Sequence, residues 1–167
     1  MNPYLSVVNQ RLHFGRLLLQ QLPPAGDTPS KRMLELALCQ SVLYQLESAY
    51  RFYLREIAST YRCRTPEQIG NVGALVADLQ AMGKHPAEAS ELANLESTSG
   101  TWLNQLLAAY RQVRTVQQEQ TSQQSPIAVV QMSADMEPVE LDAEGLKTWL
   151  AAFVELVERH RQHMQEC

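Results

Sequence analysis

Cysteine and glycine are scarce in this chain, and each scarcity argues against a class of protein. The 167 residues include three cysteines, an odd number at wide spacing with no CxxC pair, which argues against a disulfide framework and a zinc knuckle. The seven glycines form no P-loop or dinucleotide-binding fingerprint, and no GxSxG motif occurs. The sequence therefore predicts reduced thiols and identifies no catalytic residue and no cofactor.

Long hydrophobic runs are also missing. No uninterrupted apolar segment reaches the roughly 18 residues that a membrane-spanning helix needs. The N-terminal stretch MNPYLSVVNQRLHFGRLLLQQL has polar residues throughout and no small-residue cleavage site, unlike a signal peptide. We therefore expect a cytoplasmic protein that does not insert into a membrane.

Apolar residues recur at alternating steps of three and four, the spacing of amphipathic helices. This pattern predicts an all-α fold, a mainly antiparallel bundle of about five helices in a single domain over residues 1–167. The first helix ends at Pro23, and the second runs for about 30 residues from an N-cap at Ser30. A capping box at Thr65 starts the third, and Asp142 caps the last. The stripes are Leu5, Val8, Leu12, Gly15, Leu19 and Leu22; then Leu36, Cys39, Leu43, Leu46, Tyr50, Tyr53 and Ile57; and Leu146, Trp149, Phe153 and Leu156.

The middle of the chain leaves two alternatives open. The stripe continues in register through 87–120, which favours one long kinked helix, although the poor helix formers of STSG at 97–100 also permit two helices. Residues 117–141 form the irregular crossover, a flexible connector and an extended segment before the final helix. Within it, the strand-like PIAVVQM at 126–132 is interpreted as lying over the bundle, with edge pairing to a second subunit as the alternative.

The C-terminal sequence ERHRQHMQEC carries the first candidate site. His160, His163 and Cys167 continue the apolar stripe of the last helix, so three potential ligands share one face and could bind a metal ion. The simpler interpretation is that the stripe ends there, with partly hydrated histidines in place of apolar residues. No HExxH or ExxH pair supports a metal centre.

Arginines alternate with aromatic residues in a second candidate site, at Arg51, Arg55, Arg62 and Arg64. Guanidinium groups beside aromatic rings can bind phosphate and stack on bases. Against a nucleic-acid-binding function, the chain has a formal net charge of −4 and lacks a broad basic footprint. The alternative interpretation is a row of hydrated arginines beside acidic partners such as Glu47.

The opening stretch NQRLHFGRLLLQQ at 9–21 and the final helix with Trp149 and an arginine-rich end resemble an uncharacterised family of short proteobacterial proteins, known only as a domain of unknown function. The resemblance implies a bacterial cytoplasmic protein and supplies no catalytic residue. We expect a non-catalytic protein–protein interaction or adaptor module with a protein partner or as a homodimer. The alternatives are a nucleic-acid-associated protein and a metal-binding protein.

Overall fold

The computed structural model of the chain describes residues 2–23, 28–122 and 141–166. These residues form six α-helices and one short 3-10 helix, with no strand among them. The elements are α1 (Pro3–Gln20), α2 (Pro29–Thr60), η1 (Pro66–Gln68), α3 (Val72–Ala81), α4 (Ala87–Ser97), α5 (Trp102–Ser122) and α6 (Ala143–Glu166). The predicted all-α bundle is confirmed.

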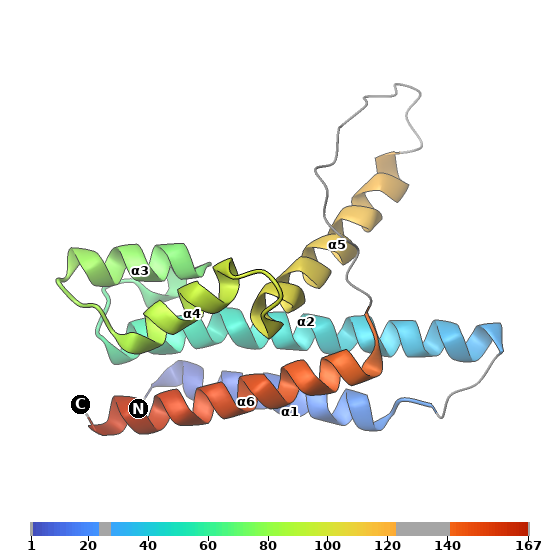
Figure 1. Cartoon of the computed structure of the whole chain (residues 1–167), viewed down its shortest axis with the longest axis horizontal. Coiled ribbons are helices and arrows are strands. Elements are labelled where there is room, and N and C mark those ends of the chain that lie inside the picture. The colour runs from blue at the N-terminus through green and yellow to red at the C-terminus, as the bar shows by residue number, and fades with distance from the viewer. Residues whose placement is uncertain (1, 24–27, 123–140, 167) are drawn as a thin grey trace.

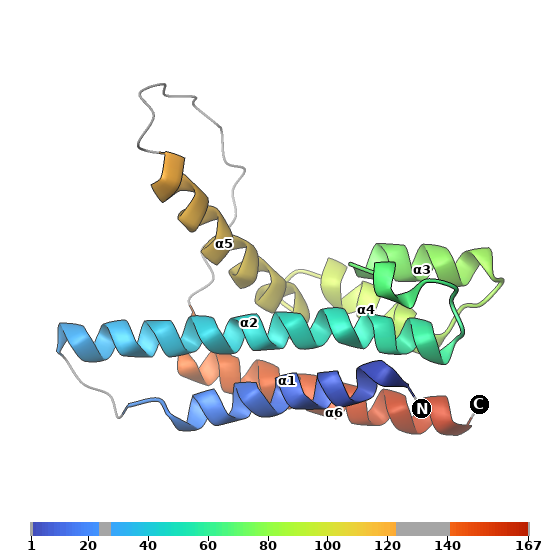
Figure 2. The same ribbon diagram turned by 180° about the vertical axis from the view of Figure 1, so that it is seen from behind.

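Helix α2 is the axis of the molecule, and its 32 residues span about 48 Å. Helices α1 and α6 lie side by side along α2, and α3 and α4 lie near the C-terminal end of α2 (Figures 1 and 2). There α4 also contacts the last turns of α6. Helix α1 runs antiparallel to both α2 and α6, and α5 points away from the bundle (Figure 1). The N-terminal turns of α2 extend beyond the ends of α1 and α6 (Figure 1).

The predicted stripes form most of the core. Val8, Leu12 and Leu19 of α1 are buried. The buried stripe residues of α2 and α6 are Cys39, Leu43, Leu46, Tyr50, Tyr53 and Ile57, and Leu146, Trp149, Phe153 and Leu156. Leu22 is only partly buried, and Leu5 and Leu36 are exposed. Leu36 lies near the start of α2, and the N-terminal end of this helix extends beyond the described helices α1 and α6 (Figure 1). Its place on the stripe alone does not bury it.

Gly15, the glycine in the predicted stripe of the first helix, lies where α1 packs on α2. It is buried, and a Cβ added there would lie 3.8 Å from Cδ2 of Leu46. That distance is an ordinary van der Waals contact, so the packing of α1 on α2 leaves room for one methyl group.

The predicted starts of three helices have different outcomes. The Asp142 cap of α6 is confirmed, because its Oδ1 accepts a hydrogen bond of 2.7 Å from the backbone N–H of Gly145. Helix α2 begins slightly earlier than expected, with Thr28 as its N-cap and proline at its first position. The Thr65 capping box is wrong: its side chain makes no capping bond, and Pro66–Gln68 forms only a 3-10 turn. Asn71 caps α3 instead, accepting from the backbone N–H of Ala74.

The single kinked helix favoured for 87–120 is also wrong, because the segment forms two helices. Helix α4 ends at Ser97 and α5 begins at Trp102. Between them Gly100 has a φ of +84°, a left-handed conformation that glycine adopts at little cost. The Thr101 hydroxyl donates to the Thr98 carbonyl at 3.0 Å and accepts from the Asn104 N–H at 3.3 Å. This turn stops α4 and caps α5 although the apolar spacing continues.

The expected crossover at 117–141 is described only in part. Its first residues, up to Ser122, belong to α5. Residues 123–140, and with them the extended segment expected at 126–132, lie outside the described residues. Within the described ranges no helix is both long and apolar enough to cross a membrane.

Candidate functional site

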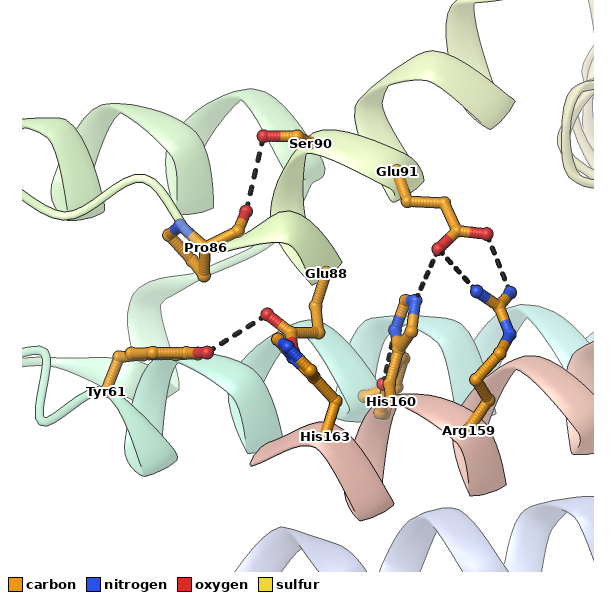
Figure 3. A network of polar contacts seen from close by, with 9 residues as sticks. Tyr61, Pro86, Glu88, Ser90, Glu91, Arg159, His160 and His163 are labelled. Carbon is orange, nitrogen blue, oxygen red and sulfur yellow. Dashed lines mark hydrogen bonds and ion pairs between the residues drawn. The ribbon is translucent and has the colours of Figure 1, made fainter. Parts of the chain in front are cut away.

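The C-terminal turns of α6 carry a network of polar contacts to α4, α2 and α1, part of which is drawn in Figure 3. Three carboxylates receive its hydrogen bonds: Glu91 and Glu88 from α4, and Glu56 from α2. We call the residues Arg159, His160, Arg161 and His163, together with these carboxylates, the C-terminal clamp.

Glu91 holds two clamp residues at once. Its carboxylate accepts from both Nη atoms of Arg159, at 2.7 and 3.0 Å, and contacts Nε2 of His160 at 2.9 Å. The hydrogen bonds from Arg159, aided by His160, lower the pKa of Glu91 to about 2. Glu91 therefore stays ionised and holds the Arg159 and His160 side chains of α6 against α4 (Figure 3).

His160 is buried, at 3% exposure, and both of its ring nitrogens have partners. Nδ1 lies 2.9 Å from the hydroxyl of the fully buried Tyr53. Burial raises the pKa of Tyr53, so its hydroxyl keeps the proton and can donate to Nδ1 while Nε2–H donates to Glu91. This arrangement satisfies every polar atom of the buried ring.

His163 makes the analogous contact one turn later. Its Nδ1 lies 2.6 Å from Oε1 of Glu88, and the Tyr61 hydroxyl donates to the other carboxylate oxygen at 3.0 Å. Glu88 is buried, and although burial itself raises the pKa of this carboxyl, the hydrogen bond from His163 and the others it accepts hold the pKa below its usual value. The His163 ring is more than half exposed.

Arg161 completes the clamp on the other side of α6. Its Nε and Nη2 atoms donate to the two oxygens of Glu56 at 2.7 and 2.8 Å, and Nη1 donates to the Asn9 side chain at 2.7 Å. Glu56 is buried. One guanidinium group therefore connects α6 to α2 and α1, and the charge of a buried carboxylate is paired.

The two predicted metal-binding histidines already have hydrogen-bond partners in the clamp. His160 is bonded on both nitrogens and His163 on one, while Cys167 lies outside the described residues. Among the residues that the structure describes, no group of three His, Cys, Asp or Glu side chains could hold a metal ion. A metal site would therefore require His160 to give up Tyr53 or Glu91, and the metal hypothesis stays a prediction.

The four predicted nucleic-acid-binding arginines differ in their contacts. Arg51 forms an ion pair with Glu47, as expected for a hydrated row. Arg55 donates to the Ile69 carbonyl at 3.1 Å and lies over the Phe52 ring. Arg62 and Arg64 are exposed just beyond α2. Arg51 and Arg55 are thus engaged within the protein, and nucleic-acid binding stays untested.

A groove with a volume of about 660 Å³ lies between α1 and α6. Its apolar lining consists of Leu19 from α1 and Leu150, Ala151 and Val154 from α6. Its polar lining consists of Arg16, Gln20, Lys147, Glu155 and Glu158. An apolar floor between charged edges is the arrangement of a protein-binding surface.

Sequence reasoning missed both the groove and the clamp partners. Arg159 pairs with Glu91 across the bundle, although Glu155 stands one turn earlier in its own helix. One signal was present: Glu88 stands four residues before the buried Leu92, on the apolar stripe of its helix. A carboxylate on one stripe and a histidine on another are a plausible buried pair, because neither is stable alone in a core.

Comparison with known proteins places the chain in a family and does not identify an activity. No curated protein and no solved structure matches the chain. A family model described as "Family of unknown function (DUF6586)" matches residues 1–167. Because this match covers the whole chain, the protein belongs to the DUF6586 family.

Proposed function

We propose that this protein is a non-catalytic protein–protein interaction module and that the groove between α1 and α6 is its binding surface. The groove carries the proposal, because Ala151 on its wall is exposed and lies beside apolar Leu150 and Val154. A partner helix seated there would bury apolar surface in the centre and meet charged side chains at the edges.

The contacts of the titratable groups support a non-catalytic function. The clamp histidines and carboxylates bond one another, which is what a structural network requires. Burial raises the pKa values of the Cys39 and Cys63 thiols, so neither is an activated nucleophile. We also propose that the protein is bacterial and cytoplasmic, and its two buried free thiols support this location because thiols stay reduced there.

The N-terminal turns of α2 offer a second apolar surface of the kind a binding module uses. Met33, Leu34 and Leu36 are 68%, 50% and 45% exposed. They lie near the start of α2, the helix whose N-terminal end extends beyond α1 and α6 (Figure 1). These turns enlarge the apolar area available to a partner that approaches from this end of the bundle.

A pair of matched variants tests the proposal. Ala151→Glu places a charge in the groove, whereas Ala77→Glu places the same charge on an exposed position of α3. Each tagged variant would be used to capture binding proteins from the native host after nuclease treatment, with mass spectrometry of what is retained. We expect the wild type and Ala77→Glu to retain the same protein, including untagged copies of this chain, and Ala151→Glu to lose it. Equal capture by all three would contradict the proposal.

A further inference from the structure

The charges along the groove are arranged unevenly on α6. Lys147 stands toward the N-terminal end of the groove, and Glu155 and Glu158 stand toward its C-terminal end. Lys147, Ala151, Val154 and Glu158 follow one another at steps of four, three and four, so they lie along one side of the helix. Lys147 and Glu158 are eleven residues, about 16 Å, apart.

This arrangement is self-complementary when two copies of α6 meet antiparallel. The midpoint between Lys147 and Glu158 falls between Ala151 and Val154. A two-fold axis at that midpoint places Lys147 of each copy opposite Glu158 of the partner subunit. The same axis places Ala151 opposite Val154 of the partner subunit. The apolar centre and both charged ends are then matched at once.

We infer that the partner that binds the α1–α6 groove is a second copy of this chain, with the two α6 helices antiparallel. This inference rests on the proposed function, since it names the occupant of the proposed binding surface. A two-fold interface uses the same patch on both subunits, and this patch has the opposite charges at its two ends that such symmetry requires. Parallel helices would instead place Lys147 opposite the partner's Lys147.

The local structure permits this contact. Ala151 is exposed, and its small side chain lets the helices approach closely. Lys147 pairs with Glu144 within the same helix at 2.7 Å, with both side chains more than half exposed. Exposed pairs of this kind contribute little stability, so Lys147 can exchange this partner for Glu158 of the partner subunit.

Charge exchange provides the test, with sedimentation equilibrium as the readout. Lys147→Glu alone creates two like-charge contacts in the dimer, and so does Glu158→Lys alone. We expect each to weaken self-association about tenfold or more at low salt. Mixing the two variants should restore association, because the mixed dimer pairs each new charge with its opposite. The double variant should restore it for the same reason. Restoration in neither case would overturn the antiparallel arrangement.

Cysteine cross-linking provides an independent test of orientation. In a Cys167→Ser background, which leaves the buried Cys39 and Cys63, Ala151→Cys is compared with Lys147→Cys. Antiparallel packing places the two 151 positions near the axis and the two 147 positions about 16 Å apart along the helices. A short bismaleimide should therefore cross-link the first variant efficiently and the second poorly. Equal cross-linking of both would overturn the inference.

The two proposals fail in distinguishable ways. A wild-type protein that sediments as a single 18.9 kDa chain at every concentration, while Ala151→Glu still loses a captured host protein, would overturn the homodimer and leave the interaction module standing. A monomer with no difference in capture between Ala151→Glu and Ala77→Glu would overturn both. Self-association that responds to Ala151→Glu and to charge exchange would support both.

Discussion

The two ends of the bundle differ in how their helices are covered. At the end where α2 and α6 finish, α4 lies against both helices, and carboxylates on α4 and α2 bind the last turns of α6 (Figures 1 and 3). At the opposite end, the first turns of α2 extend past α1 and α6, and Met33, Leu34 and Leu36 are exposed. The apolar pattern of α2 is therefore buried toward its C-terminal end and exposed in its first turns, because burial depends on whether a neighbouring helix covers each turn.

Leu43 and Leu36 provide the largest expected contrast. They occupy equivalent positions one heptad apart on α2, but Leu43 is fully buried and Leu36 is 45% exposed. Leu43→Ala leaves a cavity and should lower the free energy of unfolding by about 4 kcal/mol. Leu36→Ala should change it by less than about 0.5 kcal/mol. Urea unfolding followed by circular dichroism measures both, and similar losses for the two variants would show that a neighbour covers both positions.

The clamp should contribute nearly as much at the covered end. Arg161→Ala removes the partner of the buried Glu56 and should lower the free energy of unfolding by about 3 kcal/mol, because an unpaired charge is left buried. Arg159→Ala breaks a pair in which both side chains are at least one-third exposed, and should cost about 1 kcal/mol or less. If the two variants are equally stable, Glu56 is hydrated rather than buried.

The clamp also predicts a dependence on pH. Contacts with Arg159 and His160 lower the pKa of Glu91 to about 2, below the value of about 4.3 for an unfolded chain. The ionised carboxylate therefore stabilises the fold above that unfolded value, and the contribution disappears as pH falls toward 2.

Glu91→Gln is the variant that measures this contribution. Because the Glu91 side chain is 36% exposed, solvent screening leaves a difference of about 1 kcal/mol at neutral pH. We expect the difference in free energy of unfolding between the wild type and Glu91→Gln to shrink steadily between pH 4 and pH 2. A constant difference over this range would show that ionisation of Glu91 does not stabilise the clamp.

Gly15 should produce the smallest effect, and an increase in stability. Since a Cβ at this position makes only an ordinary contact with Leu46, Gly15→Ala should raise the free energy of unfolding by about 0.5–1 kcal/mol by removing backbone freedom from the unfolded chain. Thermal unfolding measures the change. A loss of stability would mean that the α1–α2 crossing is tighter than the structure shows.

Helix positions could be predicted from the sequence where a local pattern determines them. The faces of α2 and α6 follow from residue spacing, and the Asp142 cap follows from the chemistry of one side chain. The break at Gly100 could not be identified with certainty, because the stripe stays in register on both sides of it. The exposure of Leu36 could not be predicted either, because the sequence of α2 does not show how far the neighbouring helices extend along it.

The candidate site was less accessible, because its contacts join residues far apart in the chain. His160 was expected at the end of a core stripe and is buried there, but nothing near it in sequence identifies Tyr53 and Glu91 as its partners. The groove depends on the relative placement of α1 and α6. Its lining residues Leu19, Leu150 and Val154 look like ordinary stripe and near-stripe positions until both helices are in place.

The most direct test of the account is sedimentation equilibrium of the wild type, Ala151→Glu and Ala77→Glu over a wide range of concentrations. The account predicts that the wild type and Ala77→Glu rise from the 18.9 kDa of a single chain toward twice that mass. Ala151→Glu should remain at the mass of one chain. A wild type that stays monomeric at every concentration, or an Ala151→Glu variant that associates as strongly as the wild type, would contradict the claim that two copies meet through the α1–α6 groove.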